Sequence, residues 1–322
     1  MKHAMIWKLI KKSLEDQVPV MLLYVLESKG SSPGRQGFFM AVNVHDEMEG
    51  SVGGGIMEHK FVEMAKERLR ASVQESTVRK QLHDKSATKN QSGMICSGEQ
   101  TIWLYSVQPG DIIPVNNIIL SLQHNKNGTL ILSPSGIDFD PVTPEKDFLY
   151  EFRSEEDWLY KEKTGYKNQL FIIGGGHCAL ALSRMMRNMD FYIRVYDERI
   201  ELKTMLENDA AHEKHFVNSY VDLIEMIHSG ENHYVVIMTF GYRSDDIALR
   251  GLLDKKFRFL GLLGSQTKIN KMFDEYRSEG INEELLQQIH TPVGLPIKSQ
   301  TPEEIAVSIA AQIIEEKNRK RE

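Results

Sequence analysis

Three glycine-rich stretches of the 322-residue chain have the composition of anion-binding loops. They are "GSSPGRQG" (Gly30 to Gly37), "GSVGGGIMEHK" (Gly50 to Lys60) and "GGGHCA" (Gly174 to Ala179). Glycine leaves backbone N–H groups accessible, and N–H groups at the start of a helix bind anions such as phosphate. These stretches are therefore candidate sites for a phosphate-bearing ligand.

The third stretch satisfies the G-x-G-x-x-[G/A] pattern of dinucleotide-binding turns. Gly174 would allow a tight turn, Gly176 a close approach of phosphate, and Ala179 close packing of the helix on the strand. Asp197 ends the next apolar segment, at about the 20-residue spacing expected for a ribose-binding carboxylate. A turn without a ligand, with Asp197 capping the following helix, is the alternative interpretation.

Neighbouring residues are candidates for the same site. His177 follows Gly175 and Gly176 in the turn, where its side chain would either contact a ligand or face solvent. Gly264 and Ser265, in "GLLGSQTK", precede a second helix, and Ser265 would cap that helix or donate to an anion. Cys178 is expected to pack between helix and sheet.

The first two stretches supply different groups. The loop from Gly30 contains two hydroxyls and a cation, from Ser31, Ser32 and Arg35, and the other stretch places Gly53, Gly54 and Gly55 before a helix. Glu58, in the first turn of that helix, suits the helix dipole or would contact a ligand donor. A long hairpin loop and a glycine-rich helix entry are the structural alternatives, but two such loops so close in sequence favour a binding surface.

The chain has two cysteines, Cys96 and Cys178. They fall in different halves, which makes an internal disulfide framework unexpected, and two thiolates are too few for an iron–sulfur cluster. Cys96, in "GMICSGEQTIW", is either a reactive thiolate beside glycine or a half-buried structural cysteine.

The elements that position these residues fall into two predicted domains. Over residues 167–322, short apolar segments alternate with helical patterns, which predicts an α/β fold with a Rossmann-like, doubly wound parallel sheet. Residues 1–166 predict a mixed α+β domain that ends in a charged connecting stretch over 141–167. Its expected helices cover 1–17 and 56–74, and its expected strands cover 19–28, 38–44, 101–107, 128–133 and 147–152, with a turn at 46–50.

The amino-acid composition, the net charge and the apolar runs indicate which class of protein the chain belongs to. Hydrophobic residues make up 41% and charged residues 26%, the net charge is −6 and the isoelectric point is about 6.0. These values are typical of a soluble globular protein and give no basic field for nucleic acid. No apolar run has the length of a membrane helix, and the N-terminal pattern (Ile6, Leu9, Ile10, Leu14) indicates an amphipathic helix rather than a signal peptide. We expect a cytoplasmic protein.

Taken together, five motifs resemble those of the XdhC/CoxI family of xanthine dehydrogenase accessory factors. They are "GSSPGRQGFFMAV", "GSVGGGIMEHK", "FIIGGGHCALAL", "GLLGSQTK" and "TPVGLPIKSQTPEEIAVSIAAQII", in this order. The residues of the last motif do not by themselves suggest nucleotide binding. Its local pattern predicts a helix capped at Thr301 with Pro302 at its first position.

The resemblance implies a carrier and not an oxidoreductase. Such a protein binds molybdenum cofactor (molybdopterin or its dinucleotide form), protects it, and helps its sulfuration and insertion into xanthine dehydrogenase or a related molybdenum hydroxylase. It also implies a cysteine desulfurase as a further partner, and we expect a homodimer. The second domain would hold the cofactor phosphate, and the first would cover the metal end, with Cys96 as a molybdenum ligand or sulfur relay.

The sequence departs from the family pattern at two places. The family has Cys-Gly-Gly where this chain has Cys96-Ser97-Gly98, and it has histidine where this chain has Phe240, in the loop "TFGYRSDD". The first change affects close approach of the backbone at the lost glycine. The second makes a metal- or proton-handling role for that loop doubtful.

Two other functions are compatible with parts of the sequence. The glycine turn and Asp197 suit an NAD(P)-dependent oxidoreductase, but no catalytic Lys–Tyr or His–Asp constellation can be placed beside a nicotinamide. Xanthine dehydrogenase itself is excluded as an activity, because the chain is too short and lacks the cysteines for electron-transfer clusters. It is nevertheless expected as a name that such proteins inherit from their partner.

Overall fold

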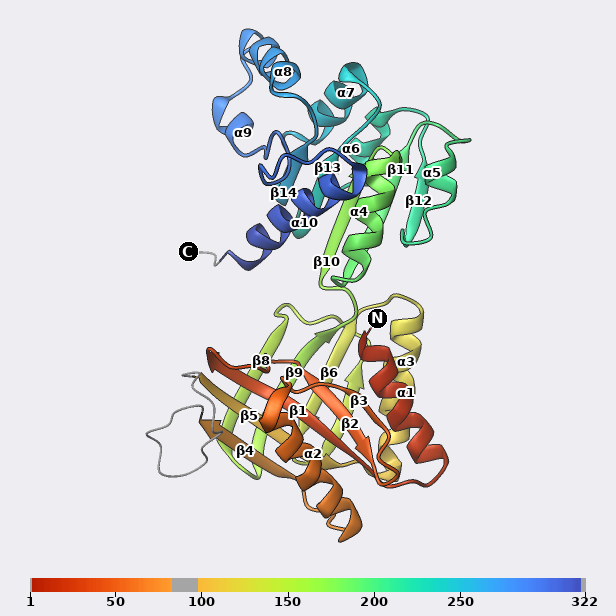
Figure 1. Ribbon diagram of the computed structural model, residues 1–322, viewed down its shortest axis with the longest axis vertical. Coiled ribbons are helices and arrows are strands. Elements are labelled where there is room, and N and C mark those ends of the chain that lie inside the picture. Colours follow the sequence, from red (N-terminus) through yellow and green to blue (C-terminus); the bar gives the residue numbers. More distant parts are fainter. Residues whose placement is uncertain (1, 83–97, 320–322) are drawn as a thin grey trace. The chain divides into compact units, whose positions relative to one another are not determined.

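The computed structural model describes residues 2–82 and 98–319. The chain folds into two compact units, Met1–Gly165 and Tyr166–Glu322 (Figure 1). The fold is the predicted combination of an α+β first unit with an α/β second unit.

The first unit contains two antiparallel sheets. One has five strands in the order β3-β2-β1-β5-β4, and the other has four in the order β7-β6-β9-β8. The strands are β1 (Val20–Gly30), β2 (Phe39–Asn43), β3 (Met48–Gly50), β4 (Thr77–Leu82), β5 (Gly98–Ser106), β6 (Gly128–Ser133), β7 (Gly136–Asp140), β8 (Phe148–Ser154) and β9 (Asp157–Thr164). The helices are α1 (Lys2–Glu15), α2 (Gly55–Arg70), the 3-10 helix η1 (Pro109–Asp111) and α3 (Ile112–Gln123).

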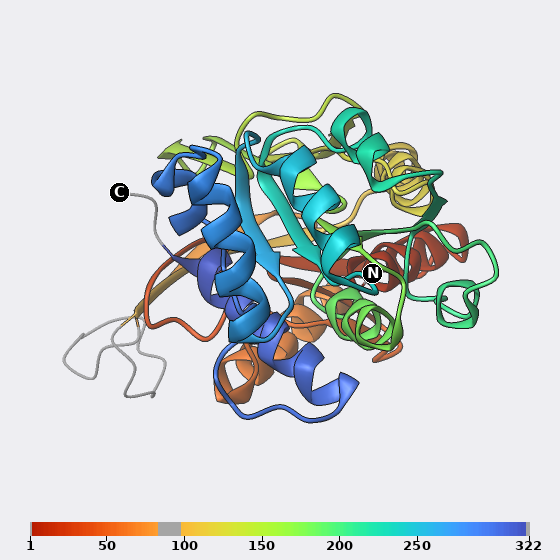
Figure 2. The ribbon, with the colours of Figure 1, turned by 90° about the horizontal axis from the view of Figure 1, so that it is seen from above.

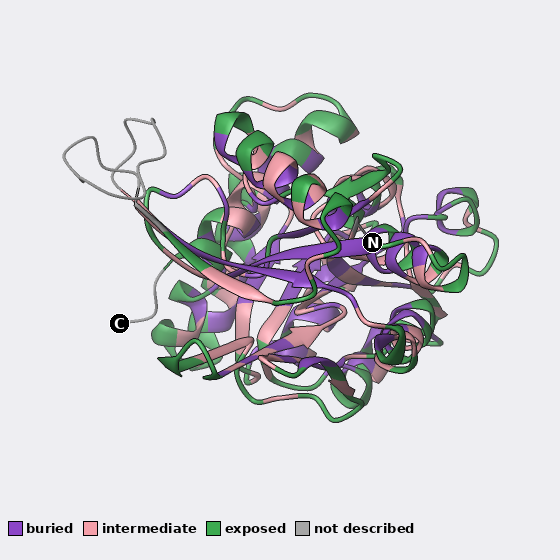
Figure 3. Ribbon diagram, turned by 90° about the horizontal axis from the view of Figure 1, so that it is seen from below, coloured by how far each residue is buried: buried purple, intermediate pink, exposed green. Residues whose placement is uncertain are grey.

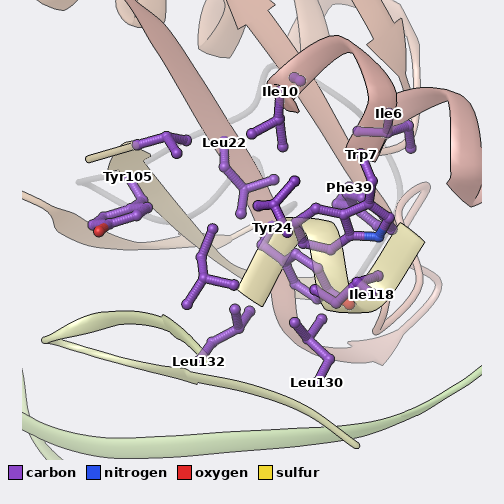
Figure 4. Packing of buried hydrophobic residues seen from close by; sticks show 14 of the residues in the cluster. Ile6, Trp7, Ile10, Leu22, Tyr24, Phe39, Tyr105, Ile118, Leu130 and Leu132 are labelled. Carbon is purple, nitrogen blue, oxygen red and sulfur yellow. The ribbon is translucent and has the colours of Figure 1, made fainter. Parts of the chain in front are cut away.

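The strands β1, β2 and β5 of the five-stranded sheet bury side chains on both faces. On one face Leu22 meets Trp7 and Ile10 of α1, together with Leu130 and Leu132 of the second sheet (Figure 4). The other face packs on α2 in a separate core. Figure 3 shows buried residues along the strands and exposed residues on the outer sides of helices and loops. Burial on both faces explains why β1 is apolar at every position from Val20 to Leu26 and not only at alternate ones.

The stretch 141–167 differs from the expected charged connection. Most of it forms the hairpin of β8 and β9, and Trp158 and Tyr160 of β9 are buried in the core. Their positions alternate with exposed Asp157 and half-buried Leu159 and Lys161, as in a strand with one buried face. The segment is therefore part of the first unit's second sheet.

The second unit is built on a five-stranded parallel sheet in the order β12-β11-β10-β13-β14. Its strands are β10 (Asn168–Ile173), β11 (Phe191–Asp197), β12 (Glu213–Phe216), β13 (Gly230–Ile237) and β14 (Phe257–Leu262). Its helices are α4 (His177–Arg187), α5 (Lys203–Leu206), η2 (Tyr220–Asp222), α6 (Leu223–Met226), α7 (Tyr242–Leu252), α8 (Gln266–Ser278), α9 (Glu283–Gln287) and α10 (Pro302–Asn318).

Both faces of this sheet are covered by helices (Figures 1 and 2). One core contains residues of α4 and α10, and the other contains residues of α7 and α8. The strand order reverses at β10, whose neighbours are β11 and β13, and ligands of open α/β sheets bind beyond the carboxyl ends of the strands at such a reversal. The glycine turn follows β10 at this place.

Two predicted helix starts are confirmed. Thr301 caps α10 by accepting a hydrogen bond from the backbone of Glu304, with Pro302 at the first helical position. Ser265 caps α8 by accepting from the backbone N–H of Lys268. The helix that carries the last family motif therefore begins as its residues predict.

Candidate functional site

The loop between β1 and β2 presents a cation and a hydroxyl to solvent. Gly30 and Gly37, at its two ends, have φ angles of 64° and 84°, in the left-handed region that favours glycine. Arg35 is exposed and donates from Nη1 to the carbonyl of Gly30 at 3.0 Å, which bridges the loop. Ser31 is exposed and Ser32 is buried, so only one of the two predicted serines faces solvent.

The glycine loop before α2 has an internal anion. One carboxylate oxygen of Glu58 accepts hydrogen bonds from the hydroxyl of Ser51 (2.6 Å) and the backbone N–H groups of Val52 (2.8 Å) and Gly54 (3.0 Å). Burial opposes ionisation of Glu58, but the hydrogen bonds from Ser51 and the backbone of Gly54, Val52 and Gly53 outweigh it, so the pKa of Glu58 is below its usual value. The sequence suggested the helix dipole as a partner of Glu58. It did not predict these hydrogen-bond donors.

The three glycines of this loop have left-handed backbones, with φ angles of 129° at Gly53, 75° at Gly54 and 68° at Gly55. A Cβ placed on Gly54 or Gly55 would meet nothing within 4 Å. Glycine is thus required there by the backbone conformation and not by crowding. The same openness leaves the backbone of these two residues accessible.

Both glycine loops of the first unit meet at the buried side chain of Gln100, on β5. Its Nε2 donates to the carbonyl of Val52 at 2.8 Å, and its Oε1 accepts from the hydroxyl of Ser32 at 3.3 Å. A Cβ on Gly34 would lie 2.1 Å from the oxygen of Val52 and 2.2 Å from Nε2 of Gln100, so only glycine fits. The predicted binding surface formed by two loops therefore has a common polar centre, which was not predicted from the sequence.

The start of β5 joins the same cluster. A Cβ on Gly98 would lie within 2.8 Å of the backbone of Ser31 and Ser32, so the start of β5 packs directly on the first loop. Gly98 is the retained glycine of the Cys96-Ser97-Gly98 sequence. Cys96, predicted as a cofactor and metal ligand, lies outside the described residues.

In the second unit, the glycine turn packs against the end of β13 and leads into α4. Gly174 has a φ of 103°, and a Cβ there would lie 2.4 Å from the carbonyl oxygen of Met238. At Gly176, which precedes the first helical residue, a Cβ would meet nothing within 4 Å. His177 is exposed, and Cys178 packs against the core as predicted. The first N–H groups of α4 therefore have open space beside Gly176, which suits an anion.

Asp197 ties β11 to this turn. Its fully buried carboxylate accepts from the backbone N–H of Gly175 at 2.7 Å, and from the backbone N–H, Nε and Nη2 of Arg199 at 2.7–2.8 Å. Burial opposes ionisation, but the Arg199 and Gly175 hydrogen bonds outweigh it and lower the pKa of Asp197. Both oxygens are bonded within the protein, and the cap position of the next helix is Leu202. The residue thus supports the turn and does not cap α5.

A second buried carboxylate lies at the same edge of the sheet. Asp245 accepts from the backbone N–H (2.9 Å) and hydroxyl (2.6 Å) of Thr239 and forms an ion pair with Lys268. Lys268 passes over Gly264, where a Cβ would lie 3.2 Å from its Cδ. Gly264 and Ser265 were predicted as ligand contacts, and in the structure they pack against and cap the segment that carries Lys268. The Asp245–Lys268 pair was not predicted.

A hollow of about 470 Å³ in the first unit has a different character. It is lined by two carboxylates, two cations, two aromatic rings, a threonine and a valine: Glu27, Val78, Arg79, Lys80, Thr101, Tyr150, Phe152 and Glu155. None of the predicted site residues that the structure describes belongs to this lining. Over residues 2–82 and 98–319, no three His, Cys, Asp or Glu side chains are placed to hold a metal ion. Within those same ranges, no helix combines the length and hydrophobicity that crossing a membrane requires.

These features define a two-unit α/β protein with converging glycine loops in its first unit and a Rossmann-type second unit. Residues 170–313 match the family model described as "XdhC Rossmann domain", and residues 13–80 match that of the "XdhC and CoxI family". The chain belongs to the XdhC and CoxI family.

Two curated proteins are similar to the chain. "Uncharacterized protein YqeB" of Escherichia coli (strain K12) is 25% identical over 307 residues, which are 94% of this chain and 44% of the relative. A probable xanthine dehydrogenase subunit of Bacillus subtilis (strain 168) is 31% identical over 84 residues, which are 26% of this chain and 23% of the relative. The chain thus spans less than half the length of these curated relatives.

A solved structure has the same fold along nearly the whole chain. The crystal structure of a xanthine dehydrogenase from Bacillus halodurans superimposes with a TM-score of 0.69 at 23% identity, covering 98% of this chain and 97% of the other. The similarity extends through both units.

Proposed function

We propose that the chain is an accessory protein of xanthine dehydrogenase or a related molybdenum hydroxylase. In this role it binds molybdenum cofactor, protects it, and assists its sulfuration and its insertion into the enzyme. Family membership supports the accessory role, and the names of two similar proteins refer to xanthine dehydrogenase.

The observation that carries this proposal is the convergence of the two glycine loops and the start of β5 around Gln100. The loop from Gly30, the loop from Gly50 and the start of β5 contact one another within the first unit. Around this cluster, exposed Arg35 and the open backbone of Gly54 and Gly55 suit anionic groups of a cofactor. When bound, the cofactor would supply the molybdenum and sulfur chemistry, and these residues would hold and shield it.

The second unit would hold a phosphate of the cofactor at the glycine turn. The open space at Gly176 and the start of α4 support this assignment, since the helix dipole and free N–H groups favour a negative charge. His177, exposed in the first turn of α4, is a proposed contact.

An NAD(P)-dependent oxidoreductase is the less favoured function. The Rossmann-type sheet is compatible with it, but the carboxylate in the ribose-binding position, Asp197, is buried and bonded to Gly175 and Arg199. Titration with NADH separates the two functions. A dehydrogenase should bind NADH more tightly than AMP, because it also contacts the nicotinamide, whereas a carrier should bind NADH no more tightly than AMP.

The direct test is to purify the protein from a host that makes molybdenum cofactor and to measure bound molybdenum, pterin fluorescence after denaturation, and nucleotide. We expect molybdenum and pterin to co-purify with the protein in a fixed ratio. Nucleotide should co-purify as well if the dinucleotide form of the cofactor is bound, but not if the mononucleotide form is bound. Protein with neither pterin nor molybdenum would contradict the proposal.

A matched pair of variants tests the glycine turn. Gly176→Ala adds a methyl group in the open space beside the start of α4 and needs no left-handed backbone, so it should change the free energy of unfolding by less than about 1 kcal/mol. It should nevertheless reduce retention of the cofactor. The control is Gly110→Ala, where a Cβ also meets nothing within 4 Å. Equal cofactor content in both variants would remove the turn from the site.

Cys96, the sulfur donor and the homodimer remain proposals. Cys96 would ligate molybdenum or relay sulfur from a cysteine desulfurase. A Cys96→Ser variant with full cofactor binding and full activation of its target enzyme would exclude both roles. Light scattering of the purified protein tests the homodimer.

A further inference from the structure

We propose that Arg199 and Phe240 form a clamp that binds a nucleobase, so that the second unit takes a nucleoside 5′-phosphate and not a bare phosphate. This inference rests on the proposed phosphate site at the glycine turn and specifies its ligand. It assigns a role to Phe240, where the sequence departs from the family pattern.

Phe240 is unusually exposed for a large apolar side chain. It follows β13 in the loop that leads to α7, and 88% of its surface is accessible. The guanidinium carbon of Arg199 lies 5.6 Å from the centre of its ring, within the range of a cation–π contact. The guanidinium of Arg199 therefore lies over the exposed ring of Phe240 at the surface.

Arg199 is held in place by hydrogen bonds to Asp197. Three of its N–H groups donate to the buried carboxylate of Asp197, at 2.8 Å from the backbone N–H, 2.8 Å from Nε and 2.7 Å from Nη2. Side-chain entropy that an ordinary surface arginine would lose on binding is therefore already lost here. The exposed side of Phe240 has no such restraint. In the clamp, Arg199 is therefore held in place and Phe240 can adjust its position.

The clamp is connected to the glycine turn by direct contacts. Asp197, which holds Arg199, also accepts from the backbone N–H of Gly175 at 2.7 Å. A Cβ on Gly174 would lie 2.8 Å from the Cα of Thr239, the residue before Phe240. Turn, arginine and phenylalanine thus belong to one compact group at the carboxyl edge of the sheet.

A ligand that uses all of these features needs an anion and a flat aromatic ring. Two van der Waals layers require a separation of about 7 Å, so the Phe240 loop must open slightly from the present 5.6 Å to admit a base. Stacking of this kind accepts every nucleobase, and an arginine wall adds a cation–π contribution. The fitting class is a nucleoside 5′-phosphate, with its phosphate at the start of α4.

The clamp distinguishes the two forms of the proposed cofactor. The mononucleotide form has a terminal phosphate without a base, whereas the dinucleotide form carries a nucleotide at that end. A protein with a working clamp holds the dinucleotide form more tightly, because only that form places a base between Arg199 and Phe240.

Calorimetric titration of the purified full chain with CMP, GMP and ribose 5-phosphate tests the clamp. Both nucleotides should bind more tightly than ribose 5-phosphate. Phe240→Ala should weaken nucleotide binding by about fivefold or more while leaving ribose 5-phosphate unchanged, and Phe240→Tyr should retain nucleotide binding. Phe152→Ala, which removes an exposed phenylalanine from the first unit, is the matched control.

Nucleotide affinity equal to that of ribose 5-phosphate, or unchanged in Phe240→Ala, would overturn the clamp. So would a Phe240→Ala variant that binds nucleotides normally but no longer captures the target enzyme, because Phe240 would then be a protein contact. Failure of the carrier function has a separate signature, since protein lacking molybdenum and pterin but binding CMP through Phe240 would keep the clamp and lose the carrier.

Discussion

The backbone N–H of Gly175 donates a 2.7 Å hydrogen bond to the buried carboxylate of Asp197. This bond joins the end of β11 to the turn that follows β10, so the shape of the turn depends on a residue 22 positions further along the chain. Arg199 neutralises the same carboxylate, and the three residues act as one structural group.

Replacement of Asp197 by asparagine should loosen this group. The variant keeps one acceptor but loses the charge that holds Arg199, and we expect the free energy of unfolding to fall by about 2 kcal/mol. Urea denaturation followed by circular dichroism measures this change. Glu207→Gln, which removes an exposed ion pair with Lys203, is the control and should cost less than about 0.5 kcal/mol. Equal stability of the two variants would contradict a supporting role for Asp197.

Replacement of Gln100 by leucine should separate the two glycine loops of the first unit. The carbonyl of Val52 and the hydroxyl of Ser32 would lose a buried partner, at a cost of about 1–3 kcal/mol. Amide hydrogen exchange should accelerate selectively over residues 30–37 and 50–55. Gln123→Leu, on the exposed end of α3, controls for the added hydrophobicity. Unchanged exchange in both loops would show that Gln100 does not hold them together.

Glu58 should make the first unit sensitive to acid. Its pKa is lower in the folded protein than in the unfolded chain, so its stabilising contribution is complete above the unfolded value of about 4.3 and is lost as the pH falls through the folded value. The stability difference between wild type and Glu58→Gln should therefore be largest above pH of about 5 and shrink toward pH of about 3. Chemical denaturation at several pH values measures it. A difference that grows on acidification would have the wrong sign.

Lys268 and Asp245 should show strong energetic coupling. Lys268→Met alone leaves the buried carboxylate of Asp245 without its cation and should cost about 3 kcal/mol. In the double variant with Asp245→Asn, the second substitution should cost much less than it does in the wild type. A double-mutant cycle by urea denaturation gives the coupling energy. Strict additivity would rule out a significant ion pair.

The fold of the second unit could be predicted because its signals are local. Apolar strands, the glycine turn after β10 and the caps at Ser265 and Thr301 each depend on a few consecutive residues, and together they define an α/β sheet. The parallel direction of the strands followed from the same alternation, because parallel strands need crossover helices.

The first unit was harder to predict because its missed elements have mixed patterns. β4 ("TVRKQL") is an edge strand with exposed Lys80, and its polar composition hid it. β9 ("DWLYKEKT") was assigned to a charged connection although Trp158 and Tyr160 alternate as in a strand. β3, expected as part of a turn, has only three residues, all exposed, and gains its identity from pairing with β2.

The candidate site was also predicted only in part. Glycines at the loops and turn were predicted from their type, but their polar partners were not, because Gln100, Asp245 and Lys268 act on residues distant in sequence. Gln100 lies two residues before Ile102 and directly before the predicted strand 101–107, and a polar residue at that position was the available signal. For Lys268, on a helix exposed along much of its length, no local pattern marks the residue.

The carboxylate of Glu58 occupies hydrogen-bond donors of the glycine loop before α2 that an external anion would use. Its carboxylate already accepts from Ser51, Val52 and Gly54, and because it is part of the same chain it is present at high effective concentration. An anion that bound to this loop would have to displace this carboxylate. Its release would be assisted by the reverse exchange, because the Glu58 carboxylate would take back the same hydrogen-bond donors.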